Sequence, residues 1–322
     1  MTPMPIAPNA PLSIVINSKS GKQPTDPFRP ALTQLLGEAG RAFSLHEVKD
    51  PSRLAAVATE AVAEACERGG VVVVAGGDGS INTVAQATLG SGRPMAVLPR
   101  GTFNYFSRTH GISSDLNEAV QVMLGARAHP VQAGLVNGRL FLVNASLGLY
   151  PQLLEDREAY KKQFGRSRLV ALVAAVSTLL RGHHRLRLRI EGDQAERDLE
   201  TPTLFVGNNQ LQLEQIGIDE ATRLEEGRLV GIVLKPLSST ALVKLGLRGA
   251  FGQLGAADEV SSFAFRRISV TPRQGFGVRR VKVATDGEVV WMKGPLEFKV
   301  AREPLWLLRP DPAPDALKAT LP

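Results

Sequence analysis

The run Ala75-Gly-Gly-Asp-Gly-Ser80 holds the residue types that point most directly to chemistry. Its glycines, Gly76, Gly77 and Gly79, carry no Cβ, so their backbone can approach an anion closely. The run follows Val71–Ala75, an unbroken apolar stretch typical of a buried parallel strand, and a helix is predicted to begin at its end. Because the first N–H groups of a helix have no acceptor within it and favour negative charge, this loop predicts a phosphate site.

Asp78 is the residue of this run that a phosphate loop alone does not need. A carboxylate repels phosphate groups unless a cation lies between them, so Asp78 predicts bound Mg²⁺. The run differs from a dinucleotide-binding fingerprint, because Asn82 stands where the third glycine belongs. It also differs from a Walker A loop, because no Gly-Lys-Ser or Gly-Lys-Thr occurs in the chain. A tight strand-to-helix turn without a ligand is the alternative interpretation.

A second glycine loop, Leu98-Pro-Arg-Gly-Thr102, follows the next predicted strand, Met95–Leu98. In a parallel sheet both loops lie at the carboxyl edge, where ligands bind. Gly101 again allows close approach, Thr102 offers a hydroxyl, and Asn104 can donate and accept hydrogen bonds. The alternative interpretation is a Pro-Gly turn in which Thr102 caps the following helix.

Two carboxylates flank a glycine in Asp286-Gly-Glu288. Asp-Gly between the apolar runs Val281–Ala284 and Val289–Met292 is an ordinary hairpin signal. As chemistry, the pair could supply a general base and a second group that orients the base or binds metal. The residues by themselves leave both interpretations open.

The elements that must position the first two motifs alternate between strand and helix. The predicted segments, in order, are strand Leu12–Asn17, helix Phe28–Glu38, strand Ala42–Val48, a helix from Pro51 to Glu67, strand Val71–Ala75, a short helix from Ser80 and strand Met95–Leu98. This order predicts a doubly wound α/β domain.

Past about residue 130 the pattern changes to short strands. Asn137-Gly138, between the runs Val131–Val136 and Arg139–Ala145, is a strong hairpin signal. This part of the chain predicts a mainly antiparallel β domain. Its further predicted strands are His184–Glu191, Asp198–Val206, Arg228–Leu234, Ser261–Thr271, Val278–Ala284 and Pro295–Val300, and its predicted helices lie near Leu169–Arg181 and Ser239–Leu247.

Composition bounds the class of protein. With 322 residues, 43% of them hydrophobic and 21% charged, the chain predicts a folded protein of two domains and excludes a disordered or collagen-like one. A single cysteine, Cys66, excludes an intrachain disulfide. The longest apolar run, Leu169–Leu180, is too short to span a bilayer, and no secretory signal is recognisable, which predicts a cytoplasmic protein.

The net charge of +7 favours an anionic partner. Between Ala159 and Ile190 there are eight Lys and Arg residues and no acids, a pattern suited to peripheral contact with the anionic inner face of a membrane. A core-packing helix with solvated ends explains the same pattern. No nucleic-acid partner is predicted, because aromatic residues make up only 5% of the chain and no binding motif accompanies the charge. The sequence leaves the oligomeric state open.

The sequence resembles the diacylglycerol kinase catalytic family, which includes bacterial lipid kinases, sphingosine kinases and ceramide kinases. The resemblance covers about residues 12 to 309 and rests on four ordered motifs: Asn17 with Ser20-Gly-Lys22, Gly-Gly-Asp-Gly-Ser80, Leu98-Pro-x-Gly-Thr-x-Asn104 and Asp286-Gly-Glu288. It implies an NAD-kinase-like, nucleotide-binding α/β domain over 1–130, with a return strand at about 303–310. It also implies an antiparallel β-sandwich domain for the lipid substrate over 131–302.

The resemblance further implies an ATP- and Mg²⁺-dependent kinase that transfers the γ-phosphate to the hydroxyl of a lipid alcohol such as diacylglycerol, ceramide or a sphingoid base. By motif match, the residues that contact ATP would be Asn17, Gly76, Gly77, Asp78, Gly79, Ser80, Thr102 and Asn104. Glu288 would take the proton of the lipid hydroxyl. Asp286 would orient Glu288 or bind metal, and Asp78 would lie near Mg²⁺. Glu226, in Glu225-Glu226-Gly-Arg-Leu229, matches an acidic stretch that holds a structural Mg²⁺ in some bacterial relatives.

The chain departs from the family pattern at Ser18, where proline is common, and at Tyr105, where an acid is common. Two other functions stay open. One is a soluble-substrate kinase of the NAD kinase type, which shares Gly-Gly-Asp-Gly, and the other is a non-catalytic relative that binds lipid or nucleotide. Retention of Asp78, Thr102 and Glu288 favours catalysis, and the Leu-Pro-x-Gly-Thr-x-Asn string favours a lipid acceptor.

Overall fold

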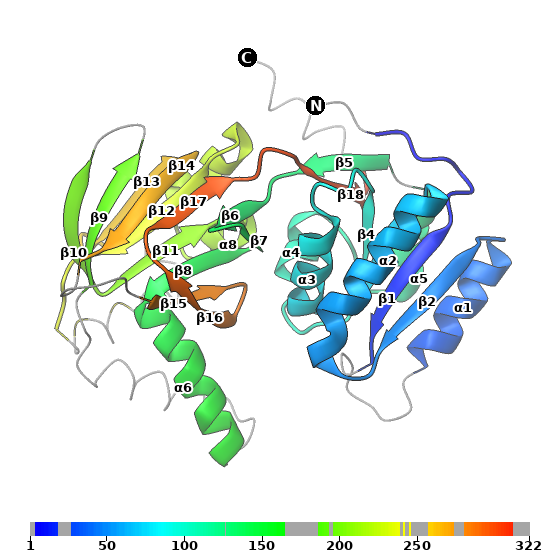
Figure 1. The fold of residues 1–322 in the computed structure, drawn as a ribbon, viewed down its shortest axis with the longest axis horizontal. Helices are drawn as coiled ribbons and strands as arrows, with labels where there is room; N and C mark the ends of the chain where they lie inside the picture. Colours follow the sequence, from blue (N-terminus) through cyan, green and yellow to red (C-terminus); the bar gives the residue numbers. More distant parts are fainter. Residues whose placement is uncertain are drawn as a thin grey trace. The chain divides into compact units, whose positions relative to one another are not determined.

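The computed structural model describes residues 4–18, 27–125, 127–164, 186–192, 196–238, 257–273 and 280–311, with single positions at 241 and 245. The chain divides into two compact units (Figure 1). One unit comprises Met1–Gln132 and Arg302–Pro322, and the other comprises Ala133–Ala301.

The first unit is built on a six-stranded sheet. Its strands are β1 (Leu12–Asn17), β2 (Phe43–Val48), β3 (Val71–Gly76), β4 (Met95–Pro99), β5 (Arg127–Val131) and β18 (Leu305–Arg309). They follow the order β2-β1-β3-β4-β18-β5, in which all neighbours are parallel except β18 and β5. The segment expected to return near 303–310 is therefore a strand of this sheet.

Five helices and one short 3-10 turn connect the described strands of this unit. They are α1 (Phe28–Glu38), η1 (Pro51–Arg53), α2 (Leu54–Arg68), α3 (Asp78–Thr88), α4 (Tyr105–Thr109) and α5 (Leu116–Gly125). α2 and α3 pack on each other and against β1 and β3, whereas α1 packs on α5, which contacts β4 and β18. The predicted mixed α/β fold is confirmed here (Figure 1).

β3 shows how the sequence positions the first glycine loop. Every residue of Val71–Gly76 is buried, because the strand lies between β1 and β4 and helices pack against the sheet. A β-branched run suits a strand with two covered faces. The strand ends at Gly76, and α3 begins two residues later at Asp78. The glycine loop therefore lies at the carboxyl edge of the sheet.

The second unit is rich in strands. They are β6 (Gly134–Val136), β7 (Arg139–Phe141), β8 (Asn144–Gly148), β9 (Leu186–Gly192), β10 (Arg197–Thr201), β11 (Thr203–Gly207), β12 (Leu229–Leu234), β13 (Val260–Phe265), β14 (Arg267–Pro272), β15 (Arg280–Thr285), β16 (Glu288–Lys293) and β17 (Leu296–Val300). They form two six-stranded antiparallel sheets, β10-β9-β14-β17-β6-β7 and β13-β12-β11-β8-β15-β16. One apolar core takes side chains from both sheets. The predicted antiparallel character is confirmed.

In the described part of this unit, three helical segments accompany the strands: α6 (Leu149–Phe164), α8 (Gln210–Gln215) and the 3-10 segment η2 (Asp219–Glu226). None of the three was predicted. The predicted helix at Leu169–Arg181 lies outside the described residues, as do all but two positions of Ser239–Leu247. Of the basic residues between Ala159 and Ile190, only Arg187 and Arg189 have described side chains.

Several predicted strands are each two strands, which corrects the sequence analysis. Arg139–Ala145 divides into β7 and β8, Asp198–Val206 into β10 and β11, and Ser261–Thr271 into β13 and β14. In each case the two strands belong to different sheets. Where the chain passes from one sheet to the other, apolar and polar residues go on alternating, because both sheets contribute side chains to the same core. The hydrophobic periodicity alone therefore does not show where one strand ends and the next begins. Val131–Val136 was likewise predicted as one strand, but Val131 ends β5 of the first unit and Gly134 begins β6.

Both predicted hairpin turns are confirmed. Asn137 and Gly138 join β6 to β7 with φ of 48° and 82°, and Asp286 and Gly287 join β15 to β16 with φ of 46° and 88°. A two-residue turn with two positive φ values matches the right-handed twist of the strands, and Asn-Gly and Asp-Gly adopt it readily.

Candidate active site

The two glycine loops of the first unit touch each other backbone to backbone. A Cβ on Gly77 would lie 3.1 Å from the Cα of Gly101, and one on Gly101 would lie 2.8 Å from the Cα of Gly77. The N–H of Arg100 also donates to the carbonyl oxygen of Gly76 at 2.8 Å. Close approach therefore requires glycine at both positions. The structure brings the two predicted loops together at the carboxyl edge of β3 and β4.

The N-terminus of α3 forms one side of this edge. Gly77 is the N-cap residue, and Asp78, Gly79 and Ser80 form the first turn. The N–H groups of a first turn point out of the helix end, where the helix dipole is positive. Asn17, at the end of β1, donates from Nδ2 to Ser80 Oγ at 2.9 Å. Asn17 and Ser80 are thus neighbours in the same site.

Asp78 is close to the first turn of α4. Burial raises the pKa of its carboxyl, and hydrogen bonds from the backbone N–H groups of Phe106, Asn104 and Tyr105 partly offset that rise. Among the described residues, no donor reaches the buried Asp78 Oδ1. A carboxylate oxygen without a hydrogen-bond partner is the type of ligand that Mg²⁺ takes. Asp78 therefore fits the predicted cation.

Asn104 closes the second loop. Its Oδ1 accepts a hydrogen bond from the N–H of Gly101 at 2.9 Å, and its Nδ2 donates to the Gly101 carbonyl at 3.1 Å. Asn104 has a φ of 49°, a left-handed conformation that asparagine tolerates better than most residues. Thr102 is exposed on the same loop. The geometry thus gives Asn104 a role in shaping the loop and leaves the Thr102 side chain accessible.

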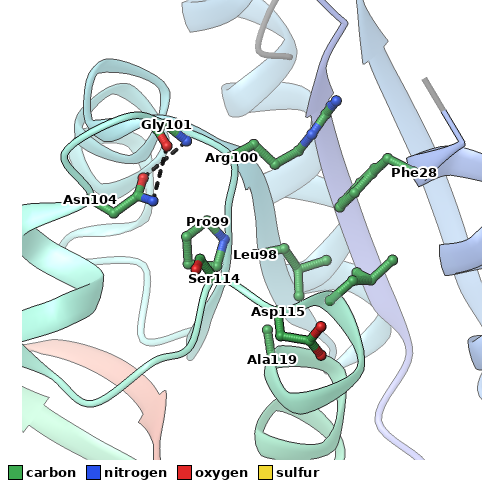
Figure 2. A pocket seen from close by; sticks show the side chains of 10 residues that line it. Phe28, Leu98, Pro99, Arg100, Gly101, Asn104, Ser114, Asp115 and Ala119 are labelled. Carbon is green, nitrogen blue, oxygen red and sulfur yellow. Dashed lines mark hydrogen bonds between the residues drawn. The ribbon is translucent and has the colours of Figure 1, made fainter. Parts of the chain in front are cut away.

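A cavity of about 360 Å³ opens beside this loop. Figure 2 shows it extending from Gly101 toward the start of α5, where Asp115 lies. The Arg100 guanidinium lies 4.2 Å from the centre of the Phe28 ring, and burial lowers the pKa of Arg100. Phe28 and Asp115 were not predicted as site residues, because they begin two helices that are far apart in the sequence and carry no motif.

In the second unit, both oxygens of the Asp286 carboxylate accept hydrogen bonds from the backbone. Oδ2 accepts from the N–H of Leu142 at 2.7 Å, and Oδ1 accepts from those of Val143 and Asn144 at 2.9 Å each. The Asp286 N–H in turn donates to the Asn144 carbonyl at 2.9 Å. These bonds anchor the β15–β16 turn to the segment between β7 and β8. The Asp286 carboxylate therefore fixes the turn that precedes Glu288, and its two predicted roles stay predictions.

Glu288 is the first residue of β16, and its side chain is 57% exposed. Arg139 on β7 donates from Nη2 to Glu288 Oε2 at 2.7 Å and from Nε to Thr285 Oγ1 at 2.9 Å. An accessible carboxylate on a rigid strand can accept a proton, and Arg139 limits its rotamers. Arg139 was not predicted as a site residue.

Glu226, whose motif suggested a structural Mg²⁺, pairs with two arginines. Its Oε1 pairs with Arg223 Nη1 at 2.6 Å, and its Oε2 lies 3.5 Å from Arg228 Nε. Within the described part of the chain, no group of three or more His, Cys, Asp or Glu side chains could hold a metal ion. The positive charges of two arginines beside one carboxylate repel a divalent cation. The metal role of Glu226 stays a prediction.

Comparison with known proteins finds a family model that matches the N-terminal part of the chain. Residues 11–136 match the model of the diacylglycerol kinase catalytic domain. This part of the chain is therefore similar to that catalytic domain.

Curated relatives carry related names. The diacylglycerol kinase of Bacillus subtilis is 33% identical over 147 residues, which are 44% of this chain and 47% of that protein. A probable lipid kinase, YegS-like, of Cronobacter sakazakii is 29% identical over 160 residues, or 46% of this chain and 51% of that protein. The chain thus spans about half the length of these relatives. A YegS-like probable lipid kinase of Pseudomonas aeruginosa aligns over 306 residues at 28% identity, covering 94% of this chain and 92% of that protein.

Solved structures share the fold over nearly the whole chain. A diacylglycerol kinase structure from Bacillus anthracis superposes with a TM-score of 0.67 at 18% identity and covers 94% of this chain and 97% of its own. A further structure from the same organism gives a TM-score of 0.72 at 20% identity, covering 94% and 98%. At this identity the likeness establishes the fold alone. No helix in the described part of the chain is long and apolar enough to cross a membrane.

Proposed function

We propose that this protein is a lipid kinase that uses ATP and Mg²⁺ and phosphorylates the hydroxyl of a lipid alcohol such as diacylglycerol, ceramide or a sphingoid base. The observation that carries the proposal is the contact between Gly77 and Gly101. It joins two glycine loops of a diacylglycerol kinase catalytic domain at one sheet edge, beside a positive helix end and an unpartnered carboxylate oxygen.

In this proposal the first unit binds the nucleotide. Backbone N–H groups of Gly77, Gly79 and Ser80 hold the phosphates, Asn17 fixes the Ser80 side chain, and Thr102 supplies a hydroxyl. Asp78 would hold Mg²⁺, which neutralises phosphate charge when bound. The cavity beside Gly101 offers room for part of the nucleotide.

The second unit supplies the base. Glu288 accepts the proton of the lipid hydroxyl as that oxygen forms a bond to the γ-phosphorus. The bond from the γ-phosphorus to the β,γ-bridging oxygen breaks, and its electron pair leaves on ADP. Asp286 holds the turn, and Arg139 orients the Glu288 carboxylate. Because phosphoryl transfer has a loose transition state, positioning and charge neutralisation supply most of the catalysis.

The test is transfer of labelled γ-phosphate from Mg-ATP to a panel of lipid alcohols in mixed micelles, with NAD and a sample without lipid as controls. We expect a labelled lipid and no labelled NAD. Labelling of NAD would replace the proposal with a soluble-substrate kinase. Binding of Mg-ATP without transfer to any member of the panel would favour a non-catalytic relative.

A further inference from the structure

Trp291 is exposed on the outer face of the β15–β16 hairpin. Its 61% exposure is larger than that of Phe103, the other large apolar side chain in the described residues that is exposed. Its strand neighbours Val290 and Met292 have the opposite orientation, and Met292 packs against the core of the unit. The exposure of Trp291 therefore follows from strand alternation at the edge of the sheet, where β16 has a partner on one side only.

Cations surround this indole. Lys282 lies opposite Trp291 in the strand pairing, with its Nζ 5.2 Å from the centre of the indole ring, and Arg280 lies opposite Lys293. Arg280 and Lys293 are exposed. The acid that meets this group is Glu155 on α6, which pairs with Lys282 at 2.7 Å. The patch of Arg280, Lys282, Trp291 and Lys293 thus carries net positive charge around an exposed aromatic ring.

A hollow of about 260 Å³ opens beside the patch. Its lining residues are Leu147, Gly148, Gln152, Leu186, Val281, Lys282 and Trp291. The patch therefore combines an aromatic ring, an adjoining apolar surface and a cationic rim.

We propose that this patch docks the protein onto the surface of a lipid bilayer that contains anionic headgroups. Indole rings favour the interface between water and hydrocarbon, and each nearby cation is attracted to an anionic surface. Charge complementarity favours a bilayer over a second copy of this chain, because two such patches would repel each other. The proposal rests on the proposed function, which requires an acceptor dissolved in a membrane.

The patch lies on the strand that also carries Glu288. Trp291 is three residues from Glu288 on one strand, so their Cα atoms are about 10 Å apart. Because side chains alternate between the two faces of a strand, Trp291 and Glu288 point to opposite faces, so docking through Trp291 brings their common strand, β16, to the bilayer surface.

The experiment measures binding to vesicles of phosphatidylcholine, with and without phosphatidylglycerol, in the absence of ATP and acceptor lipid. Cosedimentation gives the partition coefficient of the full chain. We expect Trp291→Ala to weaken partition about tenfold. Arg280→Gln with Lys293→Gln should weaken it about thirtyfold in vesicles that contain phosphatidylglycerol. The matched control is Lys49→Gln with Arg53→Gln, two exposed cations of the first unit, which should change partition much less.

A second measurement follows Trp291 directly. Since the chain has two tryptophans, Trp306→Phe leaves Trp291 as the only indole, and its emission should shift to shorter wavelength when vesicles are added. Partition equal to wild type in the Trp291 and cation variants, or no emission shift, would overturn the proposal. An emission shift that depends on protein concentration without vesicles would also overturn it and indicate self-association.

The two proposals fail differently. Patch-dependent partition without phosphoryl transfer to any lipid would remove the proposed kinase function and leave the docking surface. Phosphoryl transfer in mixed micelles without patch-dependent partition would remove the docking surface and leave the proposed kinase function.

Discussion

Replacing Asp286 by asparagine should destabilise the second unit, because its carboxylate accepts three backbone hydrogen bonds. Asparagine suits the left-handed φ of 46° at this position, so backbone strain is not added. One amide oxygen can still accept from Val143 and Asn144, but the amide nitrogen then faces the N–H of Leu142. Loss of one charge-assisted bond, an unpaired donor and two weaker bonds together cost about 2–4 kcal/mol.

The assay is differential scanning calorimetry of the full chain. For a domain of this size, the expected loss lowers Tm by about 4–16 °C. The matched control is Glu288→Gln in the same turn, which removes the same charge from a side chain that is 57% exposed. An exposed ion pair contributes about 0–1 kcal/mol, so this variant should unfold close to wild type. Equal Tm values for the two variants would refute the anchoring role of Asp286.

Two further predictions concern the first unit. Gly101→Ala should lower stability by about 1–3 kcal/mol and weaken nucleotide binding measured by calorimetric titration, because its Cβ would lie 2.8 Å from the Cα of Gly77. Gly37→Ala is the control, since no described atom lies within 4 Å of the added Cβ on α1, and unchanged nucleotide binding in both variants would contradict the loop contact. Asp78→Asn should abolish transfer yet raise Tm at neutral pH, because burial raises the pKa of Asp78 and its charged form is disfavoured in the fold. Above the ordinary carboxyl pKa, the folded wild type binds more protons than the unfolded chain, so its stability rises as pH falls. The increase in Tm caused by Asp78→Asn should therefore shrink toward acid pH. An increase in Tm that grows toward acid pH would contradict a raised pKa at Asp78.

Local sequence signals predicted the parts of the fold that depend on local chemistry. The Asn137-Gly138 and Asp286-Gly287 turns were predictable because few residue pairs accept two positive φ values. The β-branched run of β3 and the glycines after it likewise define a buried strand and a loop. The crossings between sheets were missed, because both sheets contribute to one core and the alternation does not change at the crossing.

The roles of individual site residues depend on partners that are distant in the sequence. Asp286 was predictable as a turn residue, but its three donors come from the segment near residue 143. The pairing of Glu288 with Arg139 also joins two hairpins. Asn104 was predicted to contact the nucleotide, and that contact stays a prediction. Its side chain also bonds Gly101 in its own loop, a role that the residue type alone does not reveal.

The central claim is that the glycine loops hold ATP and that Glu288 takes the proton of the acceptor. The most direct measurement compares phosphoryl transfer and ATP binding in wild type and Glu288→Gln. We predict that the variant binds Mg-ATP like wild type and transfers phosphate to lipid about 10²–10⁴-fold more slowly, the usual contribution of a general base. Transfer at the wild-type rate in Glu288→Gln, or no binding of Mg-ATP to the wild type, would contradict the account.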